Sequence, residues 1–283
     1  MLNPEQRPVC NALSSLDDDA IGEGTLKVLD LFDLTGKVAI VTGGGTGLGR
    51  QMAESLGELG ADLVLCARNA ERCEAAAADL EALGVRTLGL GCDVRDPVAI
   101  ERVVGATVER LGRIDILVNN SGTSWGASPE DVPLDGWQKV IDVNLTGAFL
   151  FAQQVGRVLI SQGDGGSIVN VASVAAFRGA PQESMNALPY NASKGGLVAL
   201  TIDLAVKWAR HGIRVNAIAP GWFPSDMSEK VLERAGDRLL GRVPLRRYGS
   251  NHDLKGAVAF LASPASDYVT GTTVFVDGGQ SAG

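Results

Sequence analysis

The sequence predicts an α/β protein built on a doubly wound parallel sheet with helices on both faces. Short apolar runs of strand character alternate with helical segments from about residue 34 onward. Such alternation is typical of βαβ units with right-handed crossovers. The first apolar run leads directly into closely spaced glycines, which favours a phosphate-binding turn. No change in composition marks a second domain, so we expect an N-terminal extension over 1–31 and one domain over 32–283.

The expected strands and helices alternate along the chain. We expect helices over 48–59, 70–83, 97–111, 134–161 and 187–210, with Gly84 and Gly212 placed to end the second and the last of them. The expected strands cover 38–41, 62–66, 86–89, 114–118, 167–171, 214–219 and 272–276. Ligands of such sheets bind outside the carboxyl ends of the strands, near the reversal of strand order. Functional side chains are therefore expected at those ends.

The composition is that of an ordinary soluble globular protein. Of 283 residues, 45% are hydrophobic and 20% are charged, and the net charge is −8. This acidic balance argues against nucleic acid and anionic membranes as partners, and no apolar run approaches the roughly 18 residues of a membrane span. The four cysteines form no C-x-x-C pair and no signal peptide opens the chain, so we expect a cytoplasmic protein. His211 and His252 lack partners at metal-ligand spacing, so we expect no metal.

A glycine-rich turn follows the first strand. Residues 37–49 read K-V-A-I-V-T-G-G-G-T-G-L-G. Gly43, Gly47 and Gly49 permit a tight turn and a close approach of backbone to ligand, because they carry no Cβ. The next helix directs unpaired N–H groups and its positive dipole end at that point. The spacing differs from the commoner G-x-G-x-x-G, and the glycines alone are also compatible with a plain turn. The strand and helix around them favour a phosphate site.

The next three strands end in polar side chains. The second ends at Arg68, about 20 residues after the glycines, where an acid would bind the ribose 2′-hydroxyl of NAD. A guanidinium there suits a 2′-phosphate, so we favour NADP(H) over a solvated arginine that opens the next helix. Asp93, after the third strand, is placed to accept from an adenine amine or to cap the following helix. The turn N-N-S-G at 119–122 would bind a cofactor or stabilise itself.

A reacting centre is expected near Ser173 and the helix that comes after it. Tyr190 and Lys194 lie four positions apart, on one face of that helix. A tyrosine donates the proton that a reduced carbonyl needs, but its free pKa near 10 must fall by roughly 3 units, about 4 kcal/mol. The positive charges of the Lys194 ammonium and of the nicotinamide would lower the tyrosine pKa in this way. Ser173 would polarise the carbonyl through a hydrogen bond.

Asn144 is an unusual residue in the middle of an apolar helix. Its position in V-I-D-V-N-L-T-G indicates that the amide has a buried partner. Its structural alternative is to satisfy backbone groups left open by a helix kink. Taken singly, Ser173, Tyr190 and Lys194 are as compatible with an ordinary structural role as with a catalytic one. Their joint placement at strand ends favours catalysis.

These motifs together resemble the short-chain dehydrogenase/reductase family. The motifs are T-G-G-G-T-G-L-G at 42–49, N-N-S-G at 119–122, Asn144, Ser173, Y-N-A-S-K at 190–194, P-G at 220–221 and V-D-G-G at 276–279. The resemblance implies a Rossmann fold with a seven-stranded parallel sheet, a nicotinamide cofactor and catalytic roles for Asn144, Ser173, Tyr190 and Lys194. In the family the lysine also binds the nicotinamide ribose, and the asparagine holds a water in a proton relay. The family pattern also agrees with Arg68 as the selector of NADP(H).

The resemblance also implies a set of cofactor-binding residues, with small departures. The expected set is Gly43, Thr46, Gly47, Leu48, Gly49, Arg68, Asn69, Asp93, Val94, Asn120, Ser121, Gly122, Tyr190, Lys194, Pro220, Gly221, Phe223 and Ser225. Ser121 stands where alanine is more frequent, and Ser225 stands where threonine often contacts the carboxamide. The loop 174–189 is a few residues longer than usual, so Glu183, Met185 and Asn186 are expected to shape the pocket.

The segment 222–242 corresponds to the family's substrate lid. Its apolar members Trp222, Phe223, Met227 and Leu232 predict partly apolar walls. The arginines Arg242, Arg246 and Arg247 are expected to be solvated or to bridge to acids, with contact to an anionic substrate as the alternative. On the helix 187–210 the polar stripe is narrow, which predicts a subunit contact. The family resemblance implies a homotetramer or a homodimer built on this helix and the long helix before it.

We therefore expect an NADP(H)-dependent oxidoreductase that interconverts a ketone and a secondary alcohol, with Tyr190 as general acid and base. A 3-oxoacyl reductase and a sugar-acid or polyol dehydrogenase are equally compatible with the sequence, and a small-ketone reductase ranks closely behind, because loops set specificity. Two alternatives stay open. One is an NADP-binding sensor or scaffold without turnover, and the other is an NAD-linked catabolic alcohol dehydrogenase.

Overall fold

The computed structural model describes residues 26–179 and 185–283, and its centre is one parallel sheet. The strands are β1 (Val38–Thr42), β2 (Asp62–Ala67), β3 (Thr87–Gly91), β4 (Ile116–Asn119), β5 (Gly166–Val171), β6 (Ile213–Pro220) and β7 (Thr273–Val276). They lie in the order β3-β2-β1-β4-β5-β6-β7, and every neighbouring pair is parallel. This is the seven-stranded Rossmann-type sheet that the sequence predicts.

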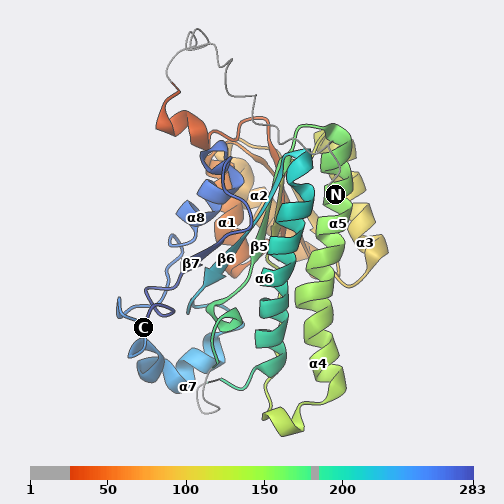
Figure 1. The fold of residues 1–283 in the computed structure, drawn as a ribbon. Coiled ribbons are helices and arrows are strands. Elements are labelled where there is room, and N and C mark those ends of the chain that lie inside the picture. The colour runs from red at the N-terminus through yellow and green to blue at the C-terminus, as the bar shows by residue number, and fades with distance from the viewer. Residues whose placement is uncertain (1–25, 180–184) are drawn as a thin grey trace, which may run out of the picture.

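Helices cover both faces of this sheet (Figure 1). They are α1 (Gly47–Glu58), α2 (Ala70–Leu80), α3 (Pro97–Leu111), α4 (Leu134–Ile141), α5 (Gly147–Gln162), α6 (Leu188–Trp208), α7 (Glu229–Leu240) and α8 (Lys255–Ala262). The expected strands, and all but one of the expected helices, begin and end within a few residues of the observed bounds. The exception is α4 and α5, which were expected as one helix.

Strand alternation sorts the apolar side chains into two cores. Along β1, Ala39 and Val41 join the core formed with α1, α2 and α8, whereas Val38 and Ile40 join the core formed with α3, α5 and α6. All four side chains are fully buried, as expected for a strand that is covered on both faces. The short apolar runs of the sequence therefore mark central strands.

The expected helix 134–161 is interrupted by a π-helical turn at Asp142–Thr146. The chain is helical throughout 134–162, as expected, and the structure adds a π-turn in the middle, whose hydrogen-bond ladder contains one extra residue. Asn144 lies in this turn and is buried. Such π-turns occur frequently at functional sites, where they redirect a side chain.

The described part of the N-terminal segment is a short 3-10 helix, Val28–Phe32. Leu31 and Phe32 are half-buried, whereas Leu26, Val28 and Leu29 are exposed. The segment packs near the turn at Pro264–Ser266, so its end lies against the body of the protein. Residues 1–25 lie outside the described residues.

The strand order reverses between β1 and β4, which places a crevice at the carboxyl ends of the central strands. Within 26–179 and 185–283, no helix has both the length and the apolar character needed to cross a bilayer. The same residues contain no cluster of three or more histidine, cysteine or acidic side chains arranged to hold a metal.

Candidate active site

A cavity of about 1220 Å³ opens at the carboxyl ends of the strands. It brings together most of the residues that the sequence singles out. They are Gly43, Thr46, Gly47, Leu48, Arg68, Asp93, Val94, Asn120, Ser121, Gly122, Ser173, Tyr190, Lys194, Pro220, Gly221, Phe223 and Ser225. Three predicted residues, Gly49, Asn69 and Asn144, do not line it, and each instead supports a neighbour.

The glycine turn is held to the end of β4 by a small hydrogen-bond network. The Asn120 side-chain amide donates to the carbonyls of Thr42 (3.0 Å) and Gly43 (3.2 Å). The Thr42 hydroxyl in turn accepts from the N–H groups of Asn120 and Ser121. A Cβ at Gly49 would lie 2.2 Å from the Gly43 carbonyl oxygen, so Gly49 allows the helix to start this close to the turn. Thr42 was not predicted, although a polar residue closing an apolar strand is a usable signal.

The first turn of α1 faces the cavity with free donors. Its N-cap, Thr46, makes no side-chain capping bond, and Gly47 and Leu48 line the cavity. The unpaired N–H groups of a helix N-terminus and its dipole favour an anion there. Gly43 (φ 65°) and Gly47 (φ 54°) have backbone conformations that suit glycine. This donor set fits the diphosphate of a nicotinamide dinucleotide.

At the ends of β2 and β3, some of the predicted residues line the cavity and one caps the helix that follows. Arg68 is exposed and lines the cavity, whereas Asn69 caps α2 by accepting from the Arg72 N–H at 2.9 Å. Asp93 does not cap α3, because Asp96 does so through the Val98 N–H. Asp93 instead pairs with Arg95 at 2.6 Å, and hydrogen bonds from Arg95 hold the pKa of the Asp93 carboxyl below its usual range. The helix-capping alternative for Asp93 is therefore wrong.

Ser173 and Tyr190 meet across the loop between β5 and α6. Ser173 is buried and accepts a hydrogen bond from the Ala175 N–H at 3.1 Å. Burial raises the pKa of Tyr190, while a hydrogen bond with Ser173 acts in the opposite direction. The sequence predicted a lowered pKa for Tyr190, and in the protein alone the direction is the reverse, because desolvation opposes the phenolate.

Lys194 lies one helical turn after Tyr190 and is 3% exposed. Its ammonium donates to the Val171 carbonyl at 2.6 Å and lies 5.6 Å from the centre of the Tyr190 ring. Burial lowers the pKa of Lys194 to about 8. The cation is thus held next to the tyrosine by the backbone at the end of β5.

The Asn144 side chain joins three segments. Its Oδ1 accepts from the Thr123 N–H at 2.8 Å, and its Nδ2 donates to the Thr123 carbonyl (2.9 Å) and to the Ser193 hydroxyl (3.0 Å). Ser193 donates to the Tyr190 carbonyl. The predicted buried partner of Asn144 is therefore present, and the amide connects the π-turn to the loop after β4 and to the start of α6.

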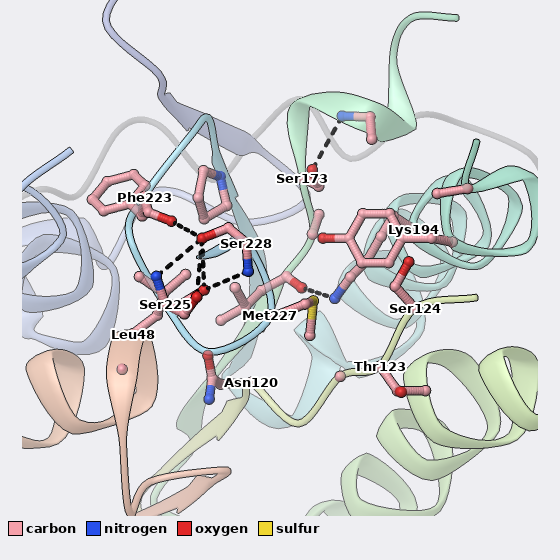
Figure 2. Close-up of a pocket in the computed structure, with 18 of the residues that line it drawn as sticks. Leu48, Asn120, Thr123, Ser124, Ser173, Lys194, Phe223, Ser225, Met227 and Ser228 are labelled. Carbon is pink, nitrogen blue, oxygen red and sulfur yellow. Dashed lines mark hydrogen bonds between the residues drawn. The ribbon is translucent and has the colours of Figure 1, made fainter. Parts of the chain in front are cut away.

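The lid crosses the cavity between the glycine turn and Lys194. In Figure 2, Phe223, Ser225 and Ser228 lie on the same side as Leu48, and Met227 lies toward Lys194. Ser228 closes the loop by donating to the Phe223 carbonyl at 2.6 Å, and the two serine hydroxyls lie 3.1 Å apart.

The lid walls agree with the sequence in part. Trp222, Phe223 and Met227 line the cavity as expected, but Leu232 does not, and Val231 and Leu239 do. Met185 and Asn186 also line it, whereas Glu183 lies outside the described residues. Arg247 bridges to Asp253 as expected, Arg246 donates to the Gly241 carbonyl, and Arg242 lines the cavity.

Comparison with known proteins is consistent with this geometry. Residues 43–281 match the family model described as Enoyl-(Acyl carrier protein) reductase. The chain belongs to the short-chain dehydrogenase/reductase family. It is 39% identical to 2-dehydro-3-deoxy-D-gluconate 5-dehydrogenase of Escherichia coli, over 89% of this chain and 98% of that protein. It is 35% identical to 3-oxoacyl-[acyl-carrier-protein] reductase of Synechocystis, over 87% of this chain and 98% of that protein.

A solved short-chain dehydrogenase has the same fold. The gluconate 5-dehydrogenase of Burkholderia cenocepacia, crystallised with NADP and tartrate, is 37% identical with a TM-score of 0.86, covering 91% of this chain and all of that one. This chain is thus a short-chain oxidoreductase of the kind that uses NAD(P) and a small-molecule substrate.

Sequence reasoning missed several cavity residues of this oxidoreductase. Ser228, Lys139, Arg178 and Gln280 line the cavity, and none of them carries a local motif. Arg178 donates to the Gln280 carbonyl, a contact between residues 102 positions apart. Only the folded chain brings such residues together.

The buried Lys194 predicts a pH-dependent stability. Its pKa is about 8 in the folded protein against 10.5 in an unfolded chain, so protonation opposes folding and this cost fades as the pH rises from 8 toward 10.5. Relative to Lys194→Met, the wild-type free energy of unfolding should rise by about 2 kcal/mol between pH 7.5 and 9.5. Urea unfolding at several pH values measures this. Lys207→Met, at an exposed position of α6, is the control, and parallel curves for wild type and Lys194→Met would contradict the prediction.

Proposed function

We propose that this protein is an NADP(H)-dependent dehydrogenase that interconverts a ketone and a secondary alcohol of a sugar acid. The observation that carries the proposal is the meeting of Ser173, Tyr190 and Lys194 in one cavity with the donor-rich start of α1. The sugar-acid class is supported by the gluconate-type relatives and by the excess of cationic side chains around the cavity. The 3-oxoacyl alternative is supported by the Synechocystis relative, which is less similar to this chain.

In the proposed mechanism the protein binds the cofactor, orients the reacting oxygen and transfers a proton to or from it. The start of α1 would hold the cofactor diphosphate, and the bound nicotinamide would supply or accept the hydride. Ser173 donates a hydrogen bond to the reacting oxygen, which stabilises the charge that develops on it. The Tyr190 hydroxyl gives that oxygen its proton in reduction and takes it back in oxidation.

Lys194 would lower the cost of the Tyr190 phenolate. Burial alone raises the pKa of this tyrosine, so catalysis near neutral pH needs a compensating positive charge. The Lys194 ammonium is held on the same helix, with the Val171 carbonyl as its anchor. With a pKa of about 8, it is largely charged at neutral pH.

Asn144 acts in this proposal as a positioning residue. Its side-chain N–H groups are taken by Thr123 and Ser193, and Ser193 holds the Tyr190 carbonyl. The amide therefore fixes the start of α6, where the proton donor lies.

Replacing Tyr190 tests the chemistry. Tyr190→Phe removes only the hydroxyl, so NADPH affinity should stay within about twofold, while kcat for D-gluconate oxidation with NADP should fall by about 10³-fold or more. Fluorescence titration of NADPH and the absorbance of NADPH formed measure the two. Full activity in the variant would overturn the mechanism, and tight NADPH binding by a wild type that turns over no carbonyl or alcohol would favour the sensor alternative.

Arg68 is the proposed selector of NADP(H). It stands at the end of β2, lines the cavity, and makes no ion pair with the described residues. The neighbouring acid, Asp93, is already paired with Arg95. A guanidinium in this place is suited to charge-assisted hydrogen bonds with a 2′-phosphate.

Replacing Arg68 tests cofactor selection. Arg68→Ala should weaken NADPH binding by about 10-fold to 100-fold and leave NADH binding within about twofold, since only NADPH has the phosphate. Fluorescence titration with both cofactors measures the change. An equal loss for both would refute selection by Arg68 and support the NAD-linked alternative.

The proposed assembly is a homotetramer or homodimer through α5 and α6. These helices are adjacent, since a Cβ at Gly156 of α5 would meet the Trp208 ring. Their outer surfaces expose Phe149, Ile160, Ile202 and Val206, with exposed fractions between 39% and 75%. Exposed apolar groups of this kind mark interaction sites.

Light scattering tests the assembly. The wild type should have the mass of two or four chains, and Val206→Arg should lower it, because a charge would be buried in the contact. A wild-type mass of one chain would contradict the proposal. Val98→Arg, which places the same charge at a 70% exposed valine of α3, is the matched control.

A further inference from the structure

The cavity is positively charged although the protein is acidic. Its lining contains six cationic side chains, Arg68, Arg95, Lys139, Arg178, Lys194 and Arg242, and two acids, Asp93 and Asp226. The net charge of the whole chain is −8. A cleft of one sign inside a surface of the other concentrates ligands of opposite charge, here anions.

Both acids are already occupied. Asp93 pairs with Arg95 at 2.6 Å, and Asp226 pairs with Arg72 of α2 at 3.6 Å. Arg68, Lys139, Arg178, Lys194 and Arg242 make no ion pair with any of the described residues. Besides Arg68, whose proposed partner is the 2′-phosphate, four cationic side chains of the lining have no ion-pair partner among the described residues.

Arg178 stands on the same loop as Ser173, five positions later. It is half-buried and donates through one guanidinium nitrogen to the Gln280 carbonyl. An arginine has five N–H donors in a fixed fork, so this contact anchors the group and leaves other donors for a ligand. The remaining candidates are less suited, because Lys139 is exposed and lies over the Trp125 ring, and Arg242 is exposed.

Gln280 supplies a second observation that indicates a ligand. Its side chain is 6% exposed and lines the cavity, and its buried Oε1 has no hydrogen-bond partner within residues 26–179 and 185–283. The atom lies close to Gly221, where a Cβ would be 3.1 Å away. A buried acceptor left without a donor costs about 1 to 3 kcal/mol, so a ligand hydroxyl that donates to it would be favoured.

We propose that Arg178 and Gln280 form the recognition site for the substrate's acid end. Arg178 binds the carboxylate, and the Oε1 of Gln280 accepts from a hydroxyl of the same sugar chain. This inference rests on the proposed sugar-acid function and names the residues that select it. Arg178 acts on binding, while Ser173 and Tyr190 act on the reacting carbon.

Two substrates that differ only at C1 test Arg178. D-Gluconate has a carboxylate where D-sorbitol has a hydroxymethyl group. Arg178→Gln should lower kcat/KM for D-gluconate by about 30-fold or more, mainly through KM, because the arginine's charge-assisted hydrogen bonds to the carboxylate are lost. For D-sorbitol, kcat/KM should change less than about threefold, and NADPH affinity should be unchanged. Arg110→Gln, at an exposed position in the last turn of α3, is the charge-matched control.

Calorimetric titration gives a readout that does not need turnover. D-Gluconate titrated into the NADPH-loaded enzyme should bind at least about tenfold more weakly to Arg178→Gln than to wild type, with partial recovery in Arg178→Lys. Gln280→Met should weaken D-gluconate and D-sorbitol equally, because both carry the hydroxyl. Melting temperatures and NADPH affinity show whether each variant is folded.

The outcomes separate the two proposals. A wild type that neither binds nor oxidises D-gluconate would overturn the sugar-acid function and this inference with it. If the ratio of kcat/KM for D-gluconate to kcat/KM for D-sorbitol is the same in wild type and in Arg178→Gln, the assignment of Arg178 is overturned. The sugar-acid function is then unaffected. Equal losses for both substrates in Arg178→Gln would mean that the arginine holds the C-terminal segment in place and does not bind the carboxylate.

Discussion

The site depends on the hydrogen bonds that join the ends of β1 and β4. These strands are neighbours at the reversal of strand order, so the crossovers on either side lead away from each other and leave a crevice. Asn120 and Thr42 tie the two strand ends together, and the glycine turn is folded against them. The start of α1 is thereby placed at one wall of the crevice, while β5 and α6 bring Ser173, Tyr190 and Lys194 to the other.

Holding the lysine in that wall is energetically unfavourable. A buried ammonium loses its hydration, and among the described residues the Val171 carbonyl at 2.6 Å and the face of the Tyr190 ring at 5.6 Å replace it in part. The loss is tolerated because two large apolar cores, one on each face of the sheet, stabilise the rest of the chain. Asn144 follows the same logic, since a π-turn, unfavourable in itself, brings its amide to Thr123 and Ser193.

Local patterns made the fold and much of the site predictable. Apolar runs reveal central strands, and Gly84 and Gly212 do adopt left-handed conformations after their helices. Arg68 was found because its distance from the glycines follows from the length of one βα unit. The π-turn itself was not predicted, but Asn144, a polar residue in an apolar stretch, marked its place, and a helix kink was the structural alternative for that residue. Arg178 and Gln280 are neighbours only in space, so no periodicity in the chain connects them.

The ion pair between Arg72 and Asp226 fastens the lid to the helix that begins just after Arg68. Its partners are 61% and 87% exposed and 3.6 Å apart, so the contact is worth at most about 1 kcal/mol and weakens as salt is added. Asp226 lines the cavity and Arg72 lies on the helix that begins just after Arg68, so added salt would loosen the contact between the segment 222–242 and α2 next to the proposed phosphate site.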